Sequence, residues 1–366
     1  MNITIQREAL LKPLQAISSI ADKKQSQPIL ACALLTTKEN ALQLAGTDLE
    51  IALVGLLPIL SLEEAGSVAV PAKKLFDICR ALPEKSIIAL TVKNDTLSLR
   101  TNDSCFNLKT LPAQDFPALE EHAYPTQCQL QTTQLKQLLT KTHFAMGQQD
   151  VRQYLNGALL HINKGKLLCV AMDGHRLAWS SVSEENVSEI DMRVILPRKS
   201  VLELIRLLDD SETTLTLSMS EQRIRIEAPD FILTSKLMHA RYPDYQRLIP
   251  QGTATATLDR EIIRQALARV AILSNEKCRG VHFHLEGQQL LLSANNMDQE
   301  HAQESLSLDY SGEKMEISFN ISYLLDAISA LTTQMVRFIF TDLNSGLRIQ
   351  STAKDNDIYV VMPMRL

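Results

Sequence analysis

Four basic residues recur at matched positions of two similar segments, and lysine and arginine in such a pattern point to anion binding. Lys73 and Arg80 lie in VAVPAKKLFDICRAL, and Lys199 and Arg206 hold the same positions in VILPRKSVLELIRLL, 126 residues further along. At about 100° per residue, these bases fall roughly opposite the apolar positions of a helix. Bases that lie on the solvent side of the same helix in two copies predict that this side binds an anion. The alternative is a set of ordinary solvated surface charges.

The segment Asp173–Arg176 is the strongest candidate for catalytic chemistry, because a carboxylate and an imidazole stand close together in it. Such a pair can orient a base, but no nucleophile elbow, phosphate-binding glycine loop or metal-ligand spacing accompanies it. We therefore expect no enzymatic activity and no cofactor. His282 and His284 would share one face of a strand, yet no third ligand is nearby in the sequence. They are interpreted as structural histidines rather than as a metal site.

The bases are positioned by an amphipathic helix that the chain repeats three times. In the middle copy, Val201, Leu204, Ile205 and Leu208 recur at i, i+3, i+4 and i+7, which is one apolar stripe. Pro197 precedes them and suits the first turn of a helix, where no amide donor is needed. The first copy has Pro71 followed by Leu75, Ile78, Cys79 and Leu82, and the third has Leu324, Ala327, Ile328 and Leu331.

An acid keeps one register in all three copies of this helix, at Asp77, Glu203 and Asp326. The third copy departs from the other two, because Ser322 and Ser329 stand where the others carry bases. A basic face is thus predicted on the first two copies.

A period near 122 in 366 residues predicts three copies of one domain. Each copy is expected to open with a short strand and a first helix, over residues 7–20, 132–145 and 259–273. Alternating runs with turn signals between them follow in each copy, which is typical of antiparallel strands. The predicted class is α+β with antiparallel sheets. The three domains are placed at residues 1–122, 123–250 and 251–366.

The composition, 45% hydrophobic and 22% charged, is that of a soluble globular protein. No apolar run approaches the roughly 18 residues that span a bilayer, and the first residues lack the features of a signal peptide. We therefore expect a cytoplasmic location. The formal net charge of −5 excludes a globally basic nucleic-acid binder, so the distribution of charge matters more than its sum.

The cysteines are scattered, form no C-x-x-C pair and are not shared between the repeats. They are predicted to be small buried hydrophobic residues in a reducing compartment, without disulfides or zinc. These residues are Cys32, Cys79, Cys105, Cys128, Cys169 and Cys278.

Segments spread over the whole chain match one known family. They are REALLKPLQ, GTDLE, VPAKKLFDICRALPE, QDVRQYLNG, DGHRLA, PRKSVLELIRLL, FILTSKL, AILSNEK, NNMDQE and YVVMPMRL. In these segments the chain resembles the bacterial DNA polymerase III beta subunit, the sliding clamp family. The resemblance implies a head-to-tail homodimer of three-domain subunits closed as a ring, with sheets outside and helices lining a central hole. It also implies that the ring encircles duplex DNA and tethers the replicative polymerase, which gives processivity without catalysis.

The resemblance implies DNA contacts that are indifferent to sequence, because sliding requires contact with phosphates and not with base edges. Lys24, Lys73 and Gln153 depart from the family, which often has arginine at the first two positions and an aromatic residue at the third. The implied positions are Lys24, Lys73, Arg80, Gln149, Gln153, Tyr154, Arg198 and Lys199.

The resemblance also implies an apolar groove that receives short peptide motifs of the polymerase catalytic subunit, clamp-loader subunits and other replication and repair proteins. Methionines suit such a groove because they adapt to several ligands, although Met362 and Met364 could equally be core residues of a last strand. Met172 and Gly346 replace a threonine and a serine common in the family. The implied positions are Leu155, Met172, Gly174, His175, Arg176, Leu177, Pro243, Arg247, Leu248, Asn320, Tyr323, Gly346, Val360, Val361, Met362, Pro363, Met364, Arg365 and Leu366.

For the dimer, the resemblance implies apolar packing between the first and third domains. Exposed ion pairs at its rim would contribute little each. The implied residues are Lys74, Phe106, Leu108, Ile272, Leu273, Glu300 and Glu304, with Asp298 as a further acid. A pure protein-interaction scaffold would also explain the repeats and the methionine-rich tail, but it leaves the outward bases unexplained.

Overall fold

The computed structural model describes residues 1–21, 27–119, 122–184, 187, 190–353 and 356–365. By their contacts these residues form two compact units. The first is Met1–Lys136 with Leu202–Leu237, and the second is Gln137–Val201 with Met238–Leu366. Each unit therefore combines one terminal repeat with part of the middle repeat.

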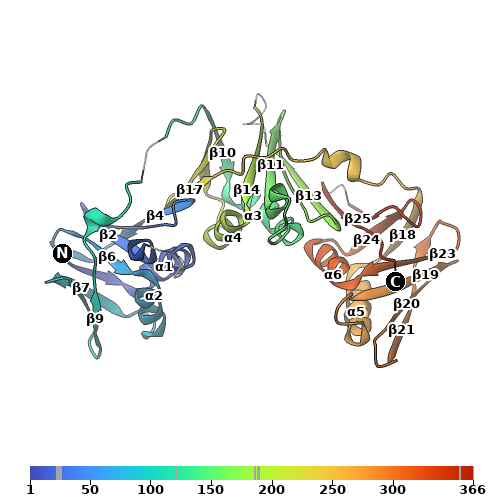
Figure 1. The fold of residues 1–366 in the computed structure, drawn as a ribbon, viewed down its shortest axis with the longest axis horizontal. Helices are drawn as coiled ribbons and strands as arrows, with labels where there is room; N and C mark the ends of the chain where they lie inside the picture. The colour runs from blue at the N-terminus through green and yellow to red at the C-terminus, as the bar shows by residue number, and fades with distance from the viewer. Residues whose placement is uncertain (22–26, 120–121, 185–186, 188–189, 354–355, 366) are drawn as a thin grey trace. The chain divides into compact units, whose positions relative to one another are not determined.

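Helices form where the apolar stripes predict them (Figure 1). Their bounds are α1 Arg7–Ile20, α2 Ala72–Ala81, α3 Thr132–Thr140, α4 Arg198–Leu207, α5 Arg260–Val270 and α6 Ile321–Ala330. The prediction was wrong at the end of α3, which was expected to reach Ala145. The buried Thr142 hydroxyl donates to the Leu138 carbonyl at 2.8 Å and lies 3.0 Å from the Cys169 sulfur. The chain tightens there into a 3-10 turn, η3 (His143–Ala145).

Two antiparallel sheets form the first unit, in the orders β5-β1-β7-β8-β9 and β10-β15-β16-β17-β4-β3-β2-β6. Helix α1 packs on β3, β4 and α2, and its side chains Leu10, Leu14 and Ile17 are buried. The strand bounds are β1 Asn2–Gln6, β2 Cys32–Lys38, β3 Ala41–Thr47, β4 Ile51–Pro58, β5 Ser61–Glu64, β6 Ser67–Pro71, β7 Ile87–Lys93, β8 Thr96–Arg100, β9 Cys105–Lys109, β10 Thr126–Gln131, β15 Thr214–Met219, β16 Arg223–Glu227 and β17 Phe231–Lys236.

Two antiparallel sheets also form the second unit, in the orders β14-β11-β12-β13-β26-β25-β24-β18-β22 and β21-β20-β19-β23. Helix α5 packs on β18, β20, β21 and α6. The strand bounds are β11 Gly157–Asn163, β12 Lys166–Met172, β13 Arg176–Ser183, β14 Asp191–Pro197, β18 Ala254–Asp259, β19 Gly280–Glu286, β20 Gln289–Asn295, β21 His301–Ser307, β22 Asp309–Tyr310, β23 Met315–Asn320, β24 Met335–Phe340, β25 Leu347–Ser351 and β26 Asp357–Val361.

The two long sheets cross the repeat boundaries. Strand β17 of the middle repeat pairs with β4 of the first, with Leu233 opposite Leu53. Strand β13 of the middle repeat pairs with β26 of the third, with Ala178 opposite Tyr359. The predicted α+β class with antiparallel sheets is confirmed. The domain limits at 122 and 250 stay a prediction about repeats, because the contact units cut across them.

The two prolines before the repeated helices lie just outside the helix rather than in its first turn. Pro71 and Pro197 each end a strand, β6 and β14, and both strands are outermost in their sheets. A residue without an amide donor is tolerated at a sheet edge. In the third copy Asn320 holds this position, and its side chain accepts hydrogen bonds from the amides of Ser322 at 2.9 Å and Tyr323 at 3.3 Å. It is therefore an N-cap.

Two predictions about burial were wrong. Ile78 on α2 and Ile205 on α4 are only half-buried. Glu203 is buried instead, because the hydroxyl of Ser19 and the guanidinium of Arg206 both donate to its carboxylate. Cys105 lies on the edge strand β9 and is exposed, and Cys278 is half-buried. The other four cysteines are buried as predicted, and all six are free thiols.

A buried ion pair ties the end of α3 to the last strand of the second unit. The Lys141 ammonium bonds to one carboxylate oxygen of Asp357, and the Ser180 hydroxyl donates to the other. The side chains of Lys141 and Asp357 are 12% and 4% exposed. Ser180 lies directly opposite Asp357 in the β13–β26 pair. The ion pair therefore sits at the join between two repeats.

Replacement of Asp357 by asparagine should lower the free energy of unfolding of the second unit by about 3–5 kcal/mol, because it leaves the buried Lys141 ammonium without its counter-charge. Urea denaturation followed by the fluorescence of Trp179, the single tryptophan of the chain, measures this. The double variant Lys141→Met/Asp357→Leu should recover most of the loss. Asp244→Asn, which removes an exposed ion pair, should change stability by about 0.5 kcal/mol at most. An equally small effect of Asp357→Asn would contradict the prediction.

Candidate functional site

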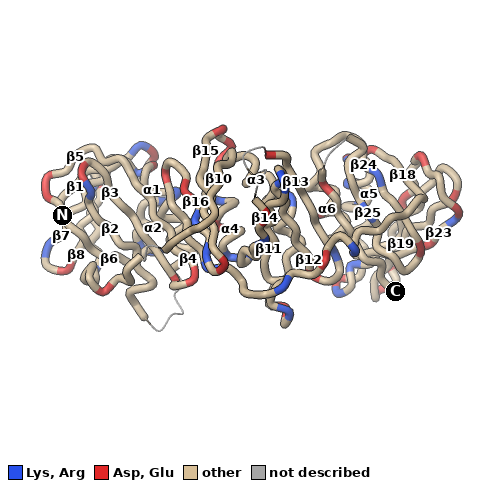
Figure 2. The backbone as a smooth tube through the Cα atoms, turned by 90° about the horizontal axis from the view of Figure 1, so that it is seen from above, with Lys and Arg blue, Asp and Glu red and all other residues tan. Residues whose placement is uncertain are grey.

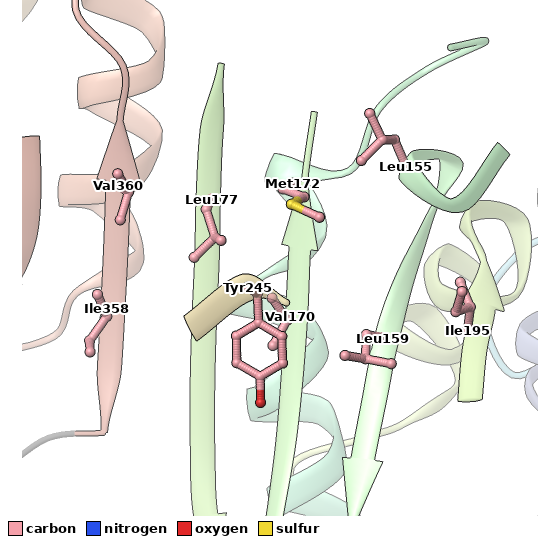
Figure 3. Close-up of a cluster of buried hydrophobic side chains, with 9 residues drawn as sticks. All are labelled: Leu155, Leu159, Val170, Met172, Leu177, Ile195, Tyr245, Ile358 and Val360. Carbon is pink, nitrogen blue, oxygen red and sulfur yellow. The ribbon is translucent and has the colours of Figure 1, made fainter. Parts of the chain in front are cut away.

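The second unit contains a cavity of about 730 Å³ at the ends of β12, β13 and β26. Its walls come from η4 (Gln153–Asn156), η6 (Tyr245–Leu248) and the loop 341–346. Met172, Leu177 and Val360 are cross-strand neighbours, so one apolar row faces the cavity. This row belongs to the buried cluster in Figure 3, which consists of Leu155, Leu159, Val170, Met172, Leu177, Ile195, Tyr245, Ile358 and Val360.

An arginine held by a carboxylate stands at the rim of this cavity. Arg152 donates to both oxygens of Asp150, at 3.0 and 2.9 Å. These hydrogen bonds lower the pKa of Asp150 to about 2, so the pair stays charged well into the acid range. Gly174 has φ of 92°, and a Cβ there would lie 2.9 Å from Nη2 of Arg152. The positive φ of this turn favours glycine, and a larger residue would also make the Arg152 guanidinium shift.

Arg176 links three elements beneath the rim. It donates to Asp173 at 3.0 Å, to the Phe144 carbonyl and to Asp326. Its guanidinium carbon lies 4.3 Å from the ring centroid of Tyr323, and its side chain is 13% exposed. A planar guanidinium can serve carboxylates in its plane and an aromatic ring on its face. Arg176 therefore joins β13 to η3 and α6.

The carboxylate of Asp173 shapes a turn instead of orienting a base. One of its oxygens accepts hydrogen bonds from the amides of His175 at 2.9 Å and Arg176 at 3.0 Å, and the other binds the guanidinium of Arg176. The His175 ring stacks on Tyr323, with ring centroids 6.5 Å apart. The segment therefore lacks the paired acid and base of a catalytic site.

The two histidines of β19 have ordinary side-chain partners. The His282 ring lies 2.8 Å from the Ser318 hydroxyl. The His284 ring lies 3.1 Å from Glu286 and 3.0 Å from Glu316. Within the part of the chain that the structure describes, no group of three or more His, Cys, Asp or Glu side chains is arranged to hold a metal ion.

The last residues run along the cavity and then leave it. The Met362 amide donates to the His175 carbonyl at 2.8 Å, and the Met364 amide donates to the Ser318 carbonyl at 2.7 Å. Met362 lines the cavity and is 41% exposed, so it is no core residue. Val361 is buried. Leu366 lies outside the described residues.

Helices α2 and α4 carry the predicted bases, and three of these bases have acid partners on their own helix. Asp77 lies 3.0 Å from Lys73 and 3.4 Å from Arg80, and Glu203 lies 2.7 Å from Arg206. Figure 2 shows basic and acidic positions interspersed along the whole tube rather than separated into two parts. The faces therefore carry less net charge than their bases alone suggest.

The other positions implied for DNA differ in exposure. Gln149 and Gln153 are exposed, whereas Arg198 and Lys199 are half-buried on α4. The Arg198 guanidinium donates to the Met146 carbonyl at 3.2 Å. Lys24 falls outside the described residues.

Except for Lys74 on α2, the residues implied for the dimer lie on or beside two edge strands. On β9, Phe106 is 36% exposed and Leu108 is 9% exposed. Helix α5 ends at Val270, earlier than predicted, and η7 (Ala271–Leu273) follows beside β20 and β21. Ile272 on η7 is 77% exposed, and Leu273 is half-buried. Lys74 and Glu300 are exposed, while Glu304 accepts from Arg269 at 2.7 Å.

Comparison with known proteins accounts for the whole chain. Residues 1–120, 129–244 and 246–365 match models of the N-terminal, central and C-terminal domains of the DNA polymerase III beta subunit. Beta sliding clamps of Pseudomonas putida and Escherichia coli are 45% and 43% identical to it, with 100% of both chains covered in each case. The chain belongs to the beta sliding clamp family.

Solved structures agree with this family. A sliding clamp of Pseudomonas aeruginosa, crystallised with griselimycin, has a TM-score of 0.94 at 44% identity, with 100% of both chains covered. The polymerase III beta subunit of Caulobacter crescentus has a TM-score of 0.90 at 34% identity, again with 100% of both chains covered. The chain is thus a DNA sliding clamp, a processivity subunit of a DNA polymerase without catalysis of its own. No described helix is long and apolar enough to cross a membrane.

In this clamp, the cavity gathers many of the positions implied for the peptide groove. Those that line it are Leu155, Met172, Gly174, Arg176, Leu177, Pro243, Arg247, Leu248, Gly346, Val360 and Met362. His175, Asn320, Tyr323, Val361, Pro363, Met364 and Arg365 are absent from its lining. Tyr323 instead lies against the Arg176 guanidinium, His175 stacks on Tyr323, and Asn320 caps α6.

Part of the cavity wall was not predicted from the sequence. Tyr154, assigned to DNA, lines the cavity and packs on the apolar cluster. The proline-containing segment 239–253, HARYPDYQRLIPQGT, was a usable signal for Ile249 and Pro250, whereas no local pattern marked the loop before β25. The lining residues outside the predicted groove are Arg152, Tyr154, Ile249, Pro250, Gln251, Thr341, Asn344 and Ser345.

Gly346 is required by close packing in this clamp. A Cβ at this position would lie 2.5 Å from a methyl group of Val360 and 3.2 Å from the Met362 sulfur. A serine at this position would therefore displace one or both side chains. The glycine allows the Met362 sulfur to lie close to the backbone.

Arg176→Ala should destabilise the second unit by about 3 kcal/mol, because it leaves Asp173 and the Phe144 carbonyl without their donor. For a unit of this size, this corresponds to a fall of roughly 6–12 °C in the calorimetric melting temperature. Arg176→Lys should recover less than half of the loss, since an ammonium lacks the planar fork. The control is Arg247→Ala, whose side chain is 86% exposed. Equal melting temperatures for Arg176→Ala and the control would contradict the role given to Arg176.

Proposed function

We propose that this sliding clamp closes as a head-to-tail homodimer, that the resulting ring encircles duplex DNA in the cytoplasm, and that its cavity binds peptide motifs of replication proteins. The observation that carries the proposal is a pair of open sheet edges at opposite ends of the repeat series.

The two repeat junctions within the chain follow one rule. Strand β17, the last strand of the middle repeat, pairs with β4 of the first repeat. Strand β26, the last strand of the third repeat, pairs in the same way with β13 of the middle repeat. Both β4 and β13 end the first half of their own repeat. Among the described strands, the same rule leaves β9 of the first repeat and β21 of the third with a partner on one side only. Two copies arranged head to tail would join β9 of each to β21 of the other. Heterologous contacts of this kind close into a ring when the rotation permits it.

Exposed apolar side chains support contact at these edges. Phe106 lies on β9, and the 77% exposed Ile272 lies on η7 beside β21. Exposed edge strands and apolar patches of this kind are usually covered by a partner. Lys74 and Glu300 are available for rim ion pairs across the contact.

The basic faces support a sequence-independent DNA contact. Three basic side chains on these helices remain exposed to solvent, at 43% for Lys73, 65% for Arg80 and 52% for Arg206. Such groups bind phosphates, and each phosphate contact gives a salt slope of about −0.9. The proposed contact set adds Lys24, Lys199, Arg198, Gln149 and Gln153, with Tyr154 shared with the groove.

The cavity supports binding of short apolar peptides from the polymerase catalytic subunit, clamp-loader subunits and other replication and repair proteins. Each leucine or phenylalanine anchor that buries about 100 Å² contributes roughly 2.5 kcal/mol before the cost of ordering the peptide. Two or three such anchors give micromolar affinity, which suits partners that exchange. Arg152 at the rim offers a donor to a polar residue of the peptide.

The double variant Ile272→Ala/Leu273→Ala should dissociate the dimer, because it removes roughly 2–5 kcal/mol of apolar burial for each side chain that the contact fully buries. Light scattering across a dilution series measures the dissociation. The wild-type clamp should stay on nicked circular duplex and leave when the circle is linearised, whereas the variant should be retained on neither. Ile262→Ala, which removes an exposed side chain of α5, is the control. Loss of the wild type from intact circles would contradict encirclement.

Met362→Ala should weaken peptide binding about tenfold, because it removes apolar contact from the cavity wall worth roughly 1.4 kcal/mol. A fluorescence titration with a QLSLF-type peptide measures this. Met297→Ala is the matched control, since this methionine is 80% exposed and lies outside the cavity lining. Equal affinities of the two variants would show that the peptide binds elsewhere.

A further inference from the structure

Each copy of the repeated helix carries an acid at one register, and each acid is paired with a base. Asp77 on α2 contacts two bases of its own helix, and Glu203 on α4 contacts one. Asp326 on α6 instead contacts Arg176 of β13, and its own helix has serines where the others have bases. The acid and base registers therefore occur together on α2 and α4.

On α2 a single carboxylate oxygen holds both bases. Oδ1 of Asp77 lies 3.0 Å from the Lys73 ammonium and 3.4 Å from the Arg80 guanidinium. Both cations also lie over the ring of Phe76, at 5.2 and 5.4 Å from its centroid. The two bases are thus drawn together over one ring and share one negative charge. All three charged side chains remain about half exposed, within reach of an anion.

On α4 the acid is fixed more firmly than the base. The Glu203 side chain is 4% exposed and the Arg206 side chain 52% exposed. One Glu203 oxygen accepts from Arg206 at 2.7 Å and from the Ser19 hydroxyl at 2.6 Å. A carboxylate that is buried in this way keeps its partners, because unpaired burial is costly. A phosphate that approaches Arg206 must therefore compete with the Glu203 carboxylate for the guanidinium.

We propose that Asp77 and Glu203 are affinity-limiting residues of the DNA-contact faces. They position the bases for phosphate contact while offsetting part of their charge, so that each phosphate is bound weakly and exchanged quickly. A clamp that slides needs this property, because strong contacts would hold it at one place on the duplex. The inference rests on the proposed DNA contact of α2 and α4.

The test measures the affinity of the full-length clamp for a short linear duplex by fluorescence anisotropy across a salt series. Asp77→Asn keeps the shape of the side chain and removes its charge. It should raise affinity about two- to fivefold at low salt, in line with the strength of an exposed ion pair, and steepen the salt slope by up to about 0.9 for each additional phosphate that the clamp neutralises. Asp326→Asn is the control and should leave affinity unchanged, because α6 carries no base at these registers.

A second background separates two ways in which the acid could act. In Lys73→Ala/Arg80→Ala, the substitution Asp77→Asn should leave affinity unchanged if the acid acts through these bases. The same rise in affinity in that background would show that the carboxylate merely repels phosphates, and would overturn the inference. Unchanged affinity on Asp77→Asn in the wild-type background would overturn it as well.

The same variants distinguish this inference from the proposed function. If Lys73→Ala/Arg80→Ala binds DNA as well as the wild type does, α2 makes no DNA contact, and both proposals fail on this helix. If that variant binds more weakly while Asp77→Asn binds no more tightly than the wild type, the DNA contact stands and only the role of the acid is wrong. Glu203→Gln, checked for folding by circular dichroism, should repeat the rise in affinity on α4.

Discussion

The structure of this clamp depends on backbone pairing between strands of different repeats. No repeat completes its own sheets, because half of the middle repeat pairs with the first and half with the third. The amides and carbonyls at a sheet edge need partners, so each repeat is stabilised by its neighbour. A series of repeats built in this way ends in two open edges, β9 and β21. In the proposed dimer, the same requirement for strand pairing would also drive assembly between chains.

The groove is a second consequence of the same pairing. Strand β13 brings Leu177 of the middle repeat beside Val360 of the third, and the apolar floor forms only when these strands meet. The buried Lys141–Asp357 pair lies at this junction, and Arg176 joins β13 to α6 beneath the rim. A peptide bound there would contact residues from two repeats. The groove therefore forms only when the strands of the middle and third repeats pair.

The sequence predicted the features that depend on local periodicity. Helices α2, α4 and α6 follow from apolar residues at i, i+3 and i+4. Contacts between residues that are far apart in the sequence could not be predicted in this way. The burial of Glu203 depends on Ser19, 184 residues away, and the place of Tyr154 in the groove depends on the cluster around it. The pairing of strands from different repeats depends on which sheet edges are left unpaired, and the periodicity of the sequence does not predict this.

The most direct test of the account is hydrogen exchange at the two open edges. Mass spectrometry should find the amides of β9 (Cys105–Lys109) and β21 (His301–Ser307) protected at concentrations where the dimer forms. On dilution into monomers both strands should lose protection together, while β17 and β26, whose partners lie within the chain, keep theirs. Rapid exchange of β9 and β21 in the assembled protein would show that these edges stay open and that the dimer is held by another surface.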